Sequence, residues 1–183
     1  MKEKNLTIYG LRAILEAIMA DRPINKIYLQ RGASGDLFKE LEQQIRKKSL
    51  SASYVPIDKL NKLTKNNHQG AVATISPVAF HNFETTIESI LSTNKSPLFL
   101  VLDNITDVRN FGAIIRTAEC TGVDLIIIPK NGSAPINDDT IKTSAGAAFN
   151  VPIAKVDHIK DALFYLQASE VKIVAATEKA DKE

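Results

Sequence analysis

Two strongly apolar runs, PLFLVLD at 97–103 and VDLIIIP at 123–129, constrain most strongly what this chain can fold into. Strands that are apolar at every position are typical of a parallel sheet that helices cover on both faces. A helical apolar pattern separates the two runs. A strand pattern at 151–156 precedes a helical one at 158–169, with Asp157 as its predicted N-cap. This alternation predicts a parallel α/β sheet with right-handed crossovers.

A further apolar run, VKIVAAT at 171–177, has the pattern of another interior strand, and only EKADKE follows it. No helical pattern remains to cover such a strand. We therefore expect either that this strand lies at the edge of the sheet or that the sequence is part of a longer protein.

The first 77 residues show a second, smaller alternation of strands and helices. Strands are predicted at 26–30, 52–57 and 70–76, and helices at 11–20, 38–49 and 58–64, the last beginning at Asp58. The chain is thus expected to have three parts: a small α/β domain over 1–77, a linker and first helix over 78–96, and a second α/β domain over 97–183.

Composition narrows the class of protein. No apolar stretch approaches the roughly 18–20 residues of a membrane span, and the start MKEKNLTIYG lacks the apolar core of a signal peptide. The single cysteine, Cys120, excludes an internal disulfide, and the three histidines form no zinc-binding pattern. We therefore expect a cytoplasmic protein with no membrane partner and no bound metal.

Charge is distributed unevenly along the chain. Residues 1–77 hold thirteen Lys and Arg against seven Asp and Glu, whereas residues 78–183 hold ten against fourteen. The basic half either contacts a polyanion or carries an ordinary imbalance of surface charge, and the count alone favours neither interpretation.

The stretch DNITDVRNFGAIIRTAECTG at 103–122 directly follows the first apolar run. A helix is predicted from near Asn110 to a stop at Gly122, because four apolar residues share one helical stripe: Phe111, Ile114, Ile115 and Ala118. Arg116 lies off this stripe. The stretch is either a helix capped by Asp107 or Asn110 with a surface arginine, or a site. Ligands of open α/β sheets bind outside the carboxyl ends of strands, where this stretch lies.

Seven spaced residues of this stretch carry a resemblance to a known family. They are Asn104, Asp107, Asn110, Gly112, Arg116, Thr117 and Ala118. Their pattern, N-x-x-D-x-x-N-x-G-x-x-x-R-T-A, resembles the first signature motif of the SpoU-type (TrmH-like) RNA 2′-O-ribose methyltransferases, which belong to the trefoil-knotted SPOUT superfamily. SAGAAFNVPIAKV at 144–156 resembles the segment that follows in the family.

The N-terminal half extends the resemblance. IYGLRAILEAI at 8–18 and HQGAVATISP at 68–77 are similar to the opening and the close of a substrate-binding domain. That domain resembles ribosomal protein L30e and occurs in the branch that methylates a guanosine of 23S ribosomal RNA. The implied fold is a small L30e-like α/β domain followed by the front part of a parallel-sheet α/β-knot methyltransferase domain, with the knot incomplete in this chain.

The resemblance also implies an activity and a set of site residues. The reaction would transfer a methyl group from S-adenosylmethionine to a ribose 2′-OH of ribosomal RNA, with Arg116 and Asn110 as catalytic residues. Thr177 and Glu178 are the candidate cofactor-binding residues because they lie at the carboxyl end of the last predicted strand, where a cofactor would bind. The resemblance implies that the remainder of the cofactor site lies beyond Glu183. The candidate RNA-binding residues are Arg12, Arg31, His68, Gln69, Arg109 and Ser144. Asn104 and Asp107 are expected to shape the loop before the helix instead.

One departure from the family limits these expectations. The family has two more motifs, which supply most of the cofactor pocket, and neither occurs in this sequence. We therefore expect a truncated and by itself inactive chain, whose full-length parent forms a homodimer. Three alternatives remain: a transfer RNA 2′-O-methyltransferase, a non-catalytic RNA-binding module, and a small-molecule α/β enzyme with a basic appendage. The last does not account for the seven-residue motif.

Overall fold

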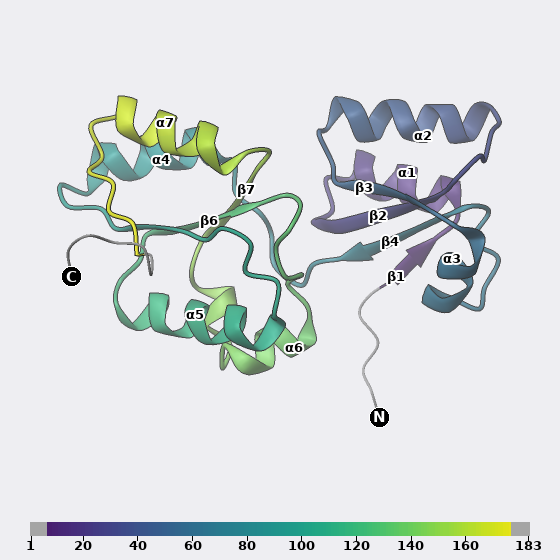
Figure 1. The fold of residues 1–183 in the computed structure, drawn as a ribbon. Helices are drawn as coiled ribbons and strands as arrows, with labels where there is room; N and C mark the ends of the chain where they lie inside the picture. Colours follow the sequence, from purple (N-terminus) through teal and green to yellow (C-terminus); the bar gives the residue numbers. More distant parts are fainter. Residues whose placement is uncertain (1–6, 177–183) are drawn as a thin grey trace.

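Two separate sheets organise the chain in the computed structural model, which describes residues 7–176 (Figure 1). The N-terminal domain holds the first sheet and three helices: β1 (Thr7–Tyr9), α1 (Leu11–Met19), β2 (Ile24–Gln30), α2 (Asp36–Lys47), β3 (Ala52–Val55), α3 (Ile57–Leu63) and β4 (Ala71–Ile75). The C-terminal domain holds the second sheet: α4 (Phe83–Thr93), β5 (Phe99–Val101), α5 (Val108–Cys120), β6 (Leu125–Pro129), α6 (Asp138–Thr143), the 3-10 turn η1 (Ala147–Phe149), β7 (Ile153–Val156) and α7 (Ile159–Ala168).

The N-terminal sheet is mixed. Its strand order is β1-β4-β2-β3, with β2 and β3 parallel and both pairings of β4 antiparallel. Side chains alternate across β2: Ile27 and Leu29 point into the core formed with α1 and α2, and Tyr28 packs on the opposite face beside Leu60 of α3. The helices therefore cover both faces of this small sheet, as Figure 1 shows.

The C-terminal sheet is parallel throughout, in the order β5-β6-β7, and this prediction is confirmed. Every residue of β6 is buried. Leu125 and Ile127 pack in the cluster under α4 and α7, whereas Ile126 and Ile128 pack under α5 and α6 (Figure 1). A strand enclosed on both faces needs an apolar side chain at each position, which is what LIIIP at 125–129 supplies.

Several expectations about individual elements are wrong. The sequence pattern does not predict β1, because three residues are too few to show a period. Strand β5 is half-buried rather than fully buried, since β6 is its only partner within the described residues and it therefore lies at an edge. The run at 171–177 forms no strand over its described part, 171–176, where Val174 is 81% exposed.

The cap of α7 also differs from the prediction. The N-cap is His158, which makes no side-chain capping bond. Asp157 instead forms an ion pair with Lys130, with 2.8 Å between Oδ2 and Nζ. The Asp157 carboxylate, which the sequence pattern predicts as the cap of α7, is therefore bound to Lys130, the residue after β6.

Candidate active site and RNA-contacting surfaces

The loop that joins β5 to α5 is shaped by its own side chains. Asp107 is the N-cap of α5, and its Oδ1 accepts a hydrogen bond from the backbone N–H of Asn110 at 2.8 Å. Asn104 adopts a left-handed backbone with φ of 54°, and its Nδ2 donates to Oδ1 of Asp103 at 3.1 Å. The loop-shaping role is confirmed for Asp107, and Asn104 occupies a conformation that asparagine tolerates better than most residues.

Gly112 lets α5 approach α6 closely. A Cβ placed on Gly112 would lie 1.9 Å from Oγ1 of Thr143 and 3.0 Å from the backbone nitrogen of Ser144. Only glycine leaves this space, because every other residue has a Cβ. The presence of glycine at this motif position is therefore explained by packing, because the missing Cβ lets α5 lie directly against α6.

The exposed face of α5 carries two arginines. Arg109 and Arg116 are seven residues apart, close to two full turns of an α-helix, so both side chains lie on one face. Both residues are exposed, and neither forms an ion pair or a side-chain hydrogen bond within residues 7–176. Phe111, Ile115 and Ala118 are buried on the other side of the helix. The arrangement presents two uncompensated positive charges to solvent.

Asn110 is also exposed, in the first turn of α5. Six residues separate it from Arg116, which places the two side chains about 120° apart around the helix axis. The catalytic assignment of Asn110 and Arg116 remains a prediction.

Two loops meet at the carboxyl edge of the C-terminal sheet. The backbone N–H of Ala134 donates to the oxygen of Ile105 at 2.7 Å, and a Cβ on Gly132 would lie 2.9 Å from Oδ1 of Asn104. The loop after β6 therefore packs directly on the loop before α5.

The candidate cofactor-binding residues cannot be placed against this edge. Thr177, Glu178 and Glu183 all lie outside the described residues, which end at 176. The expectation that a strand over 171–177 carries Thr177 and Glu178 to the carboxyl edge is wrong for its described part, since 171–176 is not a strand. A cofactor contact by these two residues, with the remainder of the site beyond Glu183, therefore stays a prediction.

Ser144 does not contact solvent, so the expectation that it binds RNA directly is wrong for this structure. The residue is fully buried, and its hydroxyl donates to the oxygen of Ile141 at 3.0 Å and accepts from the N–H of Ala148 at 3.4 Å. These bonds join α6 to η1 beside the close contact with Gly112. Ser144 is part of the packing under the site.

His68 is likewise a structural residue in its surroundings. It is buried, its Nδ1 accepts from the backbone N–H of Gly70 at 3.0 Å, and its Nε2 lies 3.0 Å from Oδ1 of Asn61. Both ring nitrogens are therefore occupied by protein atoms. His68 shapes the turn that begins β4 and leaves Gln69 as the exposed residue of that turn.

Other predicted RNA-binding residues converge on one end of the N-terminal sheet. The backbone N–H of Gly10 donates to Ala71 at 3.0 Å, and that of Gln30 donates to Gly70 at 2.8 Å. The chain segments that carry Arg12, Gln69 and Arg31 are thereby brought to the same end, and all three residues are exposed. This end of the domain therefore brings together three of the predicted RNA-binding residues, two of which are arginines.

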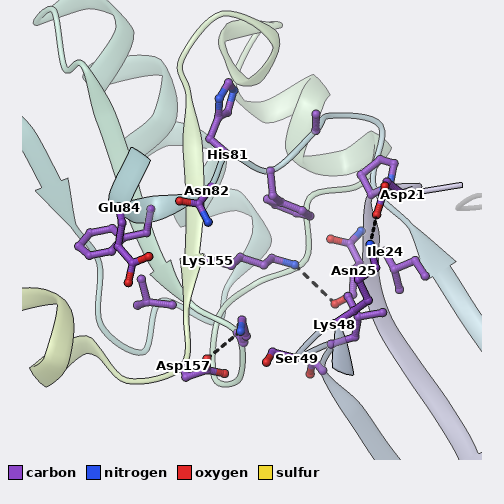
Figure 2. A pocket seen from close by; sticks show the side chains of 18 of the residues that line it. Asp21, Ile24, Asn25, Lys48, Ser49, His81, Asn82, Glu84, Lys155 and Asp157 are labelled. Carbon is purple, nitrogen blue, oxygen red and sulfur yellow. Dashed lines mark hydrogen bonds and ion pairs between the residues drawn. The ribbon is translucent and has the colours of Figure 1, made fainter. Parts of the chain in front are cut away.

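A cleft of about 850 Å³ lies between the two domains, and sequence reasoning missed it (Figure 2). Lys155 of β7 extends into it, with its Nζ 3.8 Å from the centre of the Phe80 ring and 3.5 Å from the main-chain oxygen of Asn25. Burial, and to a lesser extent the nearby charge of Lys26, lowers the pKa of Lys155 from 10.5 to about 7. The available signal was one lysine inside the otherwise apolar strand VPIAKV.

Neither a metal site nor a membrane span is found in the part of the chain that the structure describes. Over residues 7–176, no three or more His, Cys, Asp and Glu side chains are grouped so that they could hold a metal ion. Over the same range, no helix is both long enough and apolar enough to cross a bilayer.

Comparison with known proteins identifies relatives of both halves. Residues 97–183 match the SpoU rRNA Methylase family, and residues 7–81 match the family described as RNA 2′-O ribose methyltransferase substrate binding. A Staphylococcus aureus (strain MSSA476) protein, provisionally named a TrmH family tRNA/rRNA methyltransferase, is 33% identical over 174 residues, which are 91% of this chain and 70% of the relative. A Staphylococcus epidermidis relative with the same name is 31% identical over the same shares.

Solved structures give a weaker likeness. The SpoU methyltransferase AviRb from Streptomyces viridochromogenes, in complex with the cofactor AdoMet, is 19% identical to this chain, with a TM-score of 0.42. The match covers 90% of this chain and 58% of AviRb, so this chain spans little more than half the length of that structure. The two family matches and the staphylococcal relatives show that the chain belongs to the SpoU (TrmH) family of RNA methyltransferases.

Proposed function

We propose that this chain carries the RNA-binding domain and the substrate side of an enzyme that methylates a ribose 2′-OH of ribosomal RNA, at a guanosine of the 23S molecule. The observation that carries the proposal is the pair of arginines on α5. Arg109 and Arg116 share one exposed face, without an ion-pair partner among the described residues. Polyanions are the natural ligands of such a face, because guanidinium groups pair with phosphate in a bidentate manner.

The chemistry requires a positioned and activated hydroxyl. A ribose 2′-OH is a weak nucleophile that must be positioned and must lose its proton. As its oxygen bonds the methyl carbon, the carbon–sulfur bond of S-adenosylmethionine would break, S-adenosylhomocysteine would leave, and the hydroxyl proton would pass to solvent water. Arg116 is unsuited to take that proton, since an arginine side chain stays protonated at physiological pH. Its role in the proposal is to hold the adjacent phosphate and to stabilise the negative charge that develops on the 2′ oxygen. Asn110 would hydrogen-bond the ribose.

S-adenosylmethionine supplies the methyl group when bound. The described residues fit one side of such a site. The loops 103–107 and 130–137 pack together at the carboxyl edge, and Gly132 approaches Asn104 where a Cβ would be tightly crowded. In open α/β sheets ligands bind at this edge. Thr177 and Glu178 are the proposed contacts from beyond the described residues.

A second candidate substrate is transfer RNA. It is favoured by the names of the staphylococcal relatives, which couple tRNA with rRNA. The same exposed arginines would serve either RNA, since phosphate contacts carry no sequence information.

A homodimeric full-length protein in the cytoplasm remains a prediction.

The test compares Arg116→Ala with the unchanged enzyme, in the longer protein of which this chain is a part. Methyl transfer to ribosomal RNA and RNA affinity are measured on the same preparations. The proposal expects turnover to fall at least 100-fold, on the order of what removing one transition-state donor costs, while RNA affinity falls less than tenfold. If turnover and RNA affinity fall by the same factor, Arg116 contributes to RNA binding only and not to catalysis. No methyl transfer by the unchanged protein to any RNA would favour the non-catalytic binding module.

A further inference from the structure

The two domains are joined by a small set of polar contacts. Nδ2 of Asn25 donates to the main-chain oxygen of Ile136 at 2.7 Å, and the hydroxyl of Ser51 donates to Oδ1 of Asn131 at 2.7 Å. Both acceptors lie in the loop 130–137 that follows β6. The N-terminal domain is thus held by the loop that also packs on the motif loop before α5.

Lys155 adds the third contact between the domains. Figure 2 shows its side chain crossing the cleft from β7 toward Asn25, whose main-chain oxygen accepts from Nζ at 3.5 Å. Phe80, in the segment between the domains, lies against the same amine. No carboxylate within residues 7–176 forms an ion pair with Lys155, and Oδ1 of Asn25 is buried without a hydrogen-bond partner in the same part of the chain.

We propose that Asn25, Ser51 and Lys155 are positioning residues. Asn25 and Ser51 dock the RNA-binding domain on loop 130–137, Lys155 of β7 bonds Asn25 from the other domain, and together they fix the orientation of the RNA-binding domain relative to the arginine face of α5. The docking contacts stand on the structure alone. Only their role, to align bound RNA with α5, rests on the proposed function. Asn25 stands at the start of β2, and Arg31 follows its end. At about 3.3 Å per residue, the strand places the basic end roughly 20 Å from the interface. A small rotation at the interface would therefore move the RNA-binding end by several ångströms.

Docking should depend on pH through the Lys155 amine. Docking buries this amine and lowers its pKa to about 7, whereas an undocked lysine has its ordinary pKa of 10.5. Between these values the docked state binds fewer protons than the undocked state, so docking strengthens as pH rises through this window and is weakest below pH 7. The charged and titratable groups that face Lys155 in the cleft or act on it are Asp21, Arg22, Lys26, Lys48, His81, Glu84, Lys130, Asp157, His158, Asp161 and Tyr165.

Two measurements on the intact chain, without RNA or cofactor, test the docking. The first is the pKa of the Lys155 amine by nuclear magnetic resonance. The second is the distance between spin labels at Gln43→Cys on α2 and Gln167→Cys on α7, in a Cys120→Ser background. We expect a pKa near 7, and a ratio of docked to undocked chain that is nearly constant below pH 7 and increases by up to tenfold for each pH unit between 7 and 9.

Variants separate docking from general stability. Lys155→Met keeps the apolar stem over Phe80 and should abolish the pH dependence. Asn25→Ala combined with Ser51→Ala should broaden the distance distribution and return the pKa of Lys155 toward 10.5, because two donors to loop 130–137 are lost. Matched controls outside the interface are Lys62→Met, and Asn66→Ala combined with Ser53→Ala, which should change neither quantity.

Two outcomes would overturn the proposal. One is an ordinary pKa for Lys155 in the unchanged chain. The other is a pKa near 7 with distances that stay the same in the Asn25→Ala, Ser51→Ala variant. Because neither measurement involves RNA, a failure here is distinguishable from a failure of the proposed methyl transfer.

Discussion

At the scale of single residues, the motif of α5 divides into residues that build the helix and residues that the helix displays. Asp107 caps the first turn, and Gly112 admits α6. Asn110 and Arg116 are exposed and free to meet a ligand. Because Asp107 and Gly112 fix the position of α5, the side chains of Asn110 and Arg116 start from a defined place near the carboxyl edge of the sheet.

Gly112→Ala should destabilise the C-terminal domain by about 1–3 kcal/mol, the usual cost of forcing an extra methyl into a packed interior. The added Cβ meets Thr143 and the backbone of Ser144, and the backbone cannot retreat without moving α6. Thermal or urea unfolding measures the loss. The double variant with Thr143→Ala should recover part of it, since the nearest clash is then removed. Additive losses in the two variants would contradict the contact.

Asp107→Ala should cost about 1 kcal/mol of stability, because the N–H of Asn110 loses its side-chain acceptor. Asp107→Ser should retain most of the stability, since a serine hydroxyl caps as well. Urea unfolding of both variants compares them directly. Equal destabilisation by alanine and serine would show that Asp107 acts by something other than capping.

At the scale of elements, the sequence pattern predicts a helix or strand correctly where residues close together in the chain determine it. The amphipathic stripe of Phe111, Ile115 and Ala118 is enough to specify α5, and the continuous apolar run is enough to specify β6. Strand pairing depends on partners distant in sequence, which explains the edge position of β5 and the missing strand at 171–176. The cleft could not be predicted either, because Lys155 and Asn25 are 130 residues apart in the chain.

Helix α5 as an element should contribute to RNA binding through its arginine face. Arg109→Ala and Arg116→Ala should each weaken RNA affinity, and the double variant more than either, because each removes a phosphate contact. The slope of log affinity against log salt should become shallower by about one for each arginine lost. Fluorescence anisotropy with a ribosomal RNA fragment measures both quantities. Lys39→Ala on α2 serves as a control of equal charge, and a similar effect of that variant would show that only net charge matters.

At the scale of the whole molecule, two basic surfaces belong to different domains. The end of the N-terminal sheet carries Arg12, Arg31 and Gln69, and α5 carries the arginine face. The interface around Lys155 lies between them, at the opposite end of β2 from Arg31. One RNA molecule that touches both surfaces would gain affinity from both, provided that the domains stay docked.

RNA affinity of the whole chain should therefore fall steeply with added salt, and Arg12→Ala with Arg31→Ala should weaken it. The same anisotropy titration between 50 and 200 mM salt, roughly the range over which phosphate contacts are screened, checks this. An affinity that stays constant with salt would show that the basic end of the N-terminal domain does not contact the RNA backbone.

The most direct test of the central claim is to map ribose 2′-O-methylation in cells that lack the gene for this protein. The proposed function predicts that one guanosine of 23S ribosomal RNA loses its 2′-O-methyl group, and that the full-length protein restores it while Arg116→Ala does not. Unchanged methylation at every ribosomal position would contradict the claim, and a loss confined to transfer RNA would assign the enzyme to the other substrate.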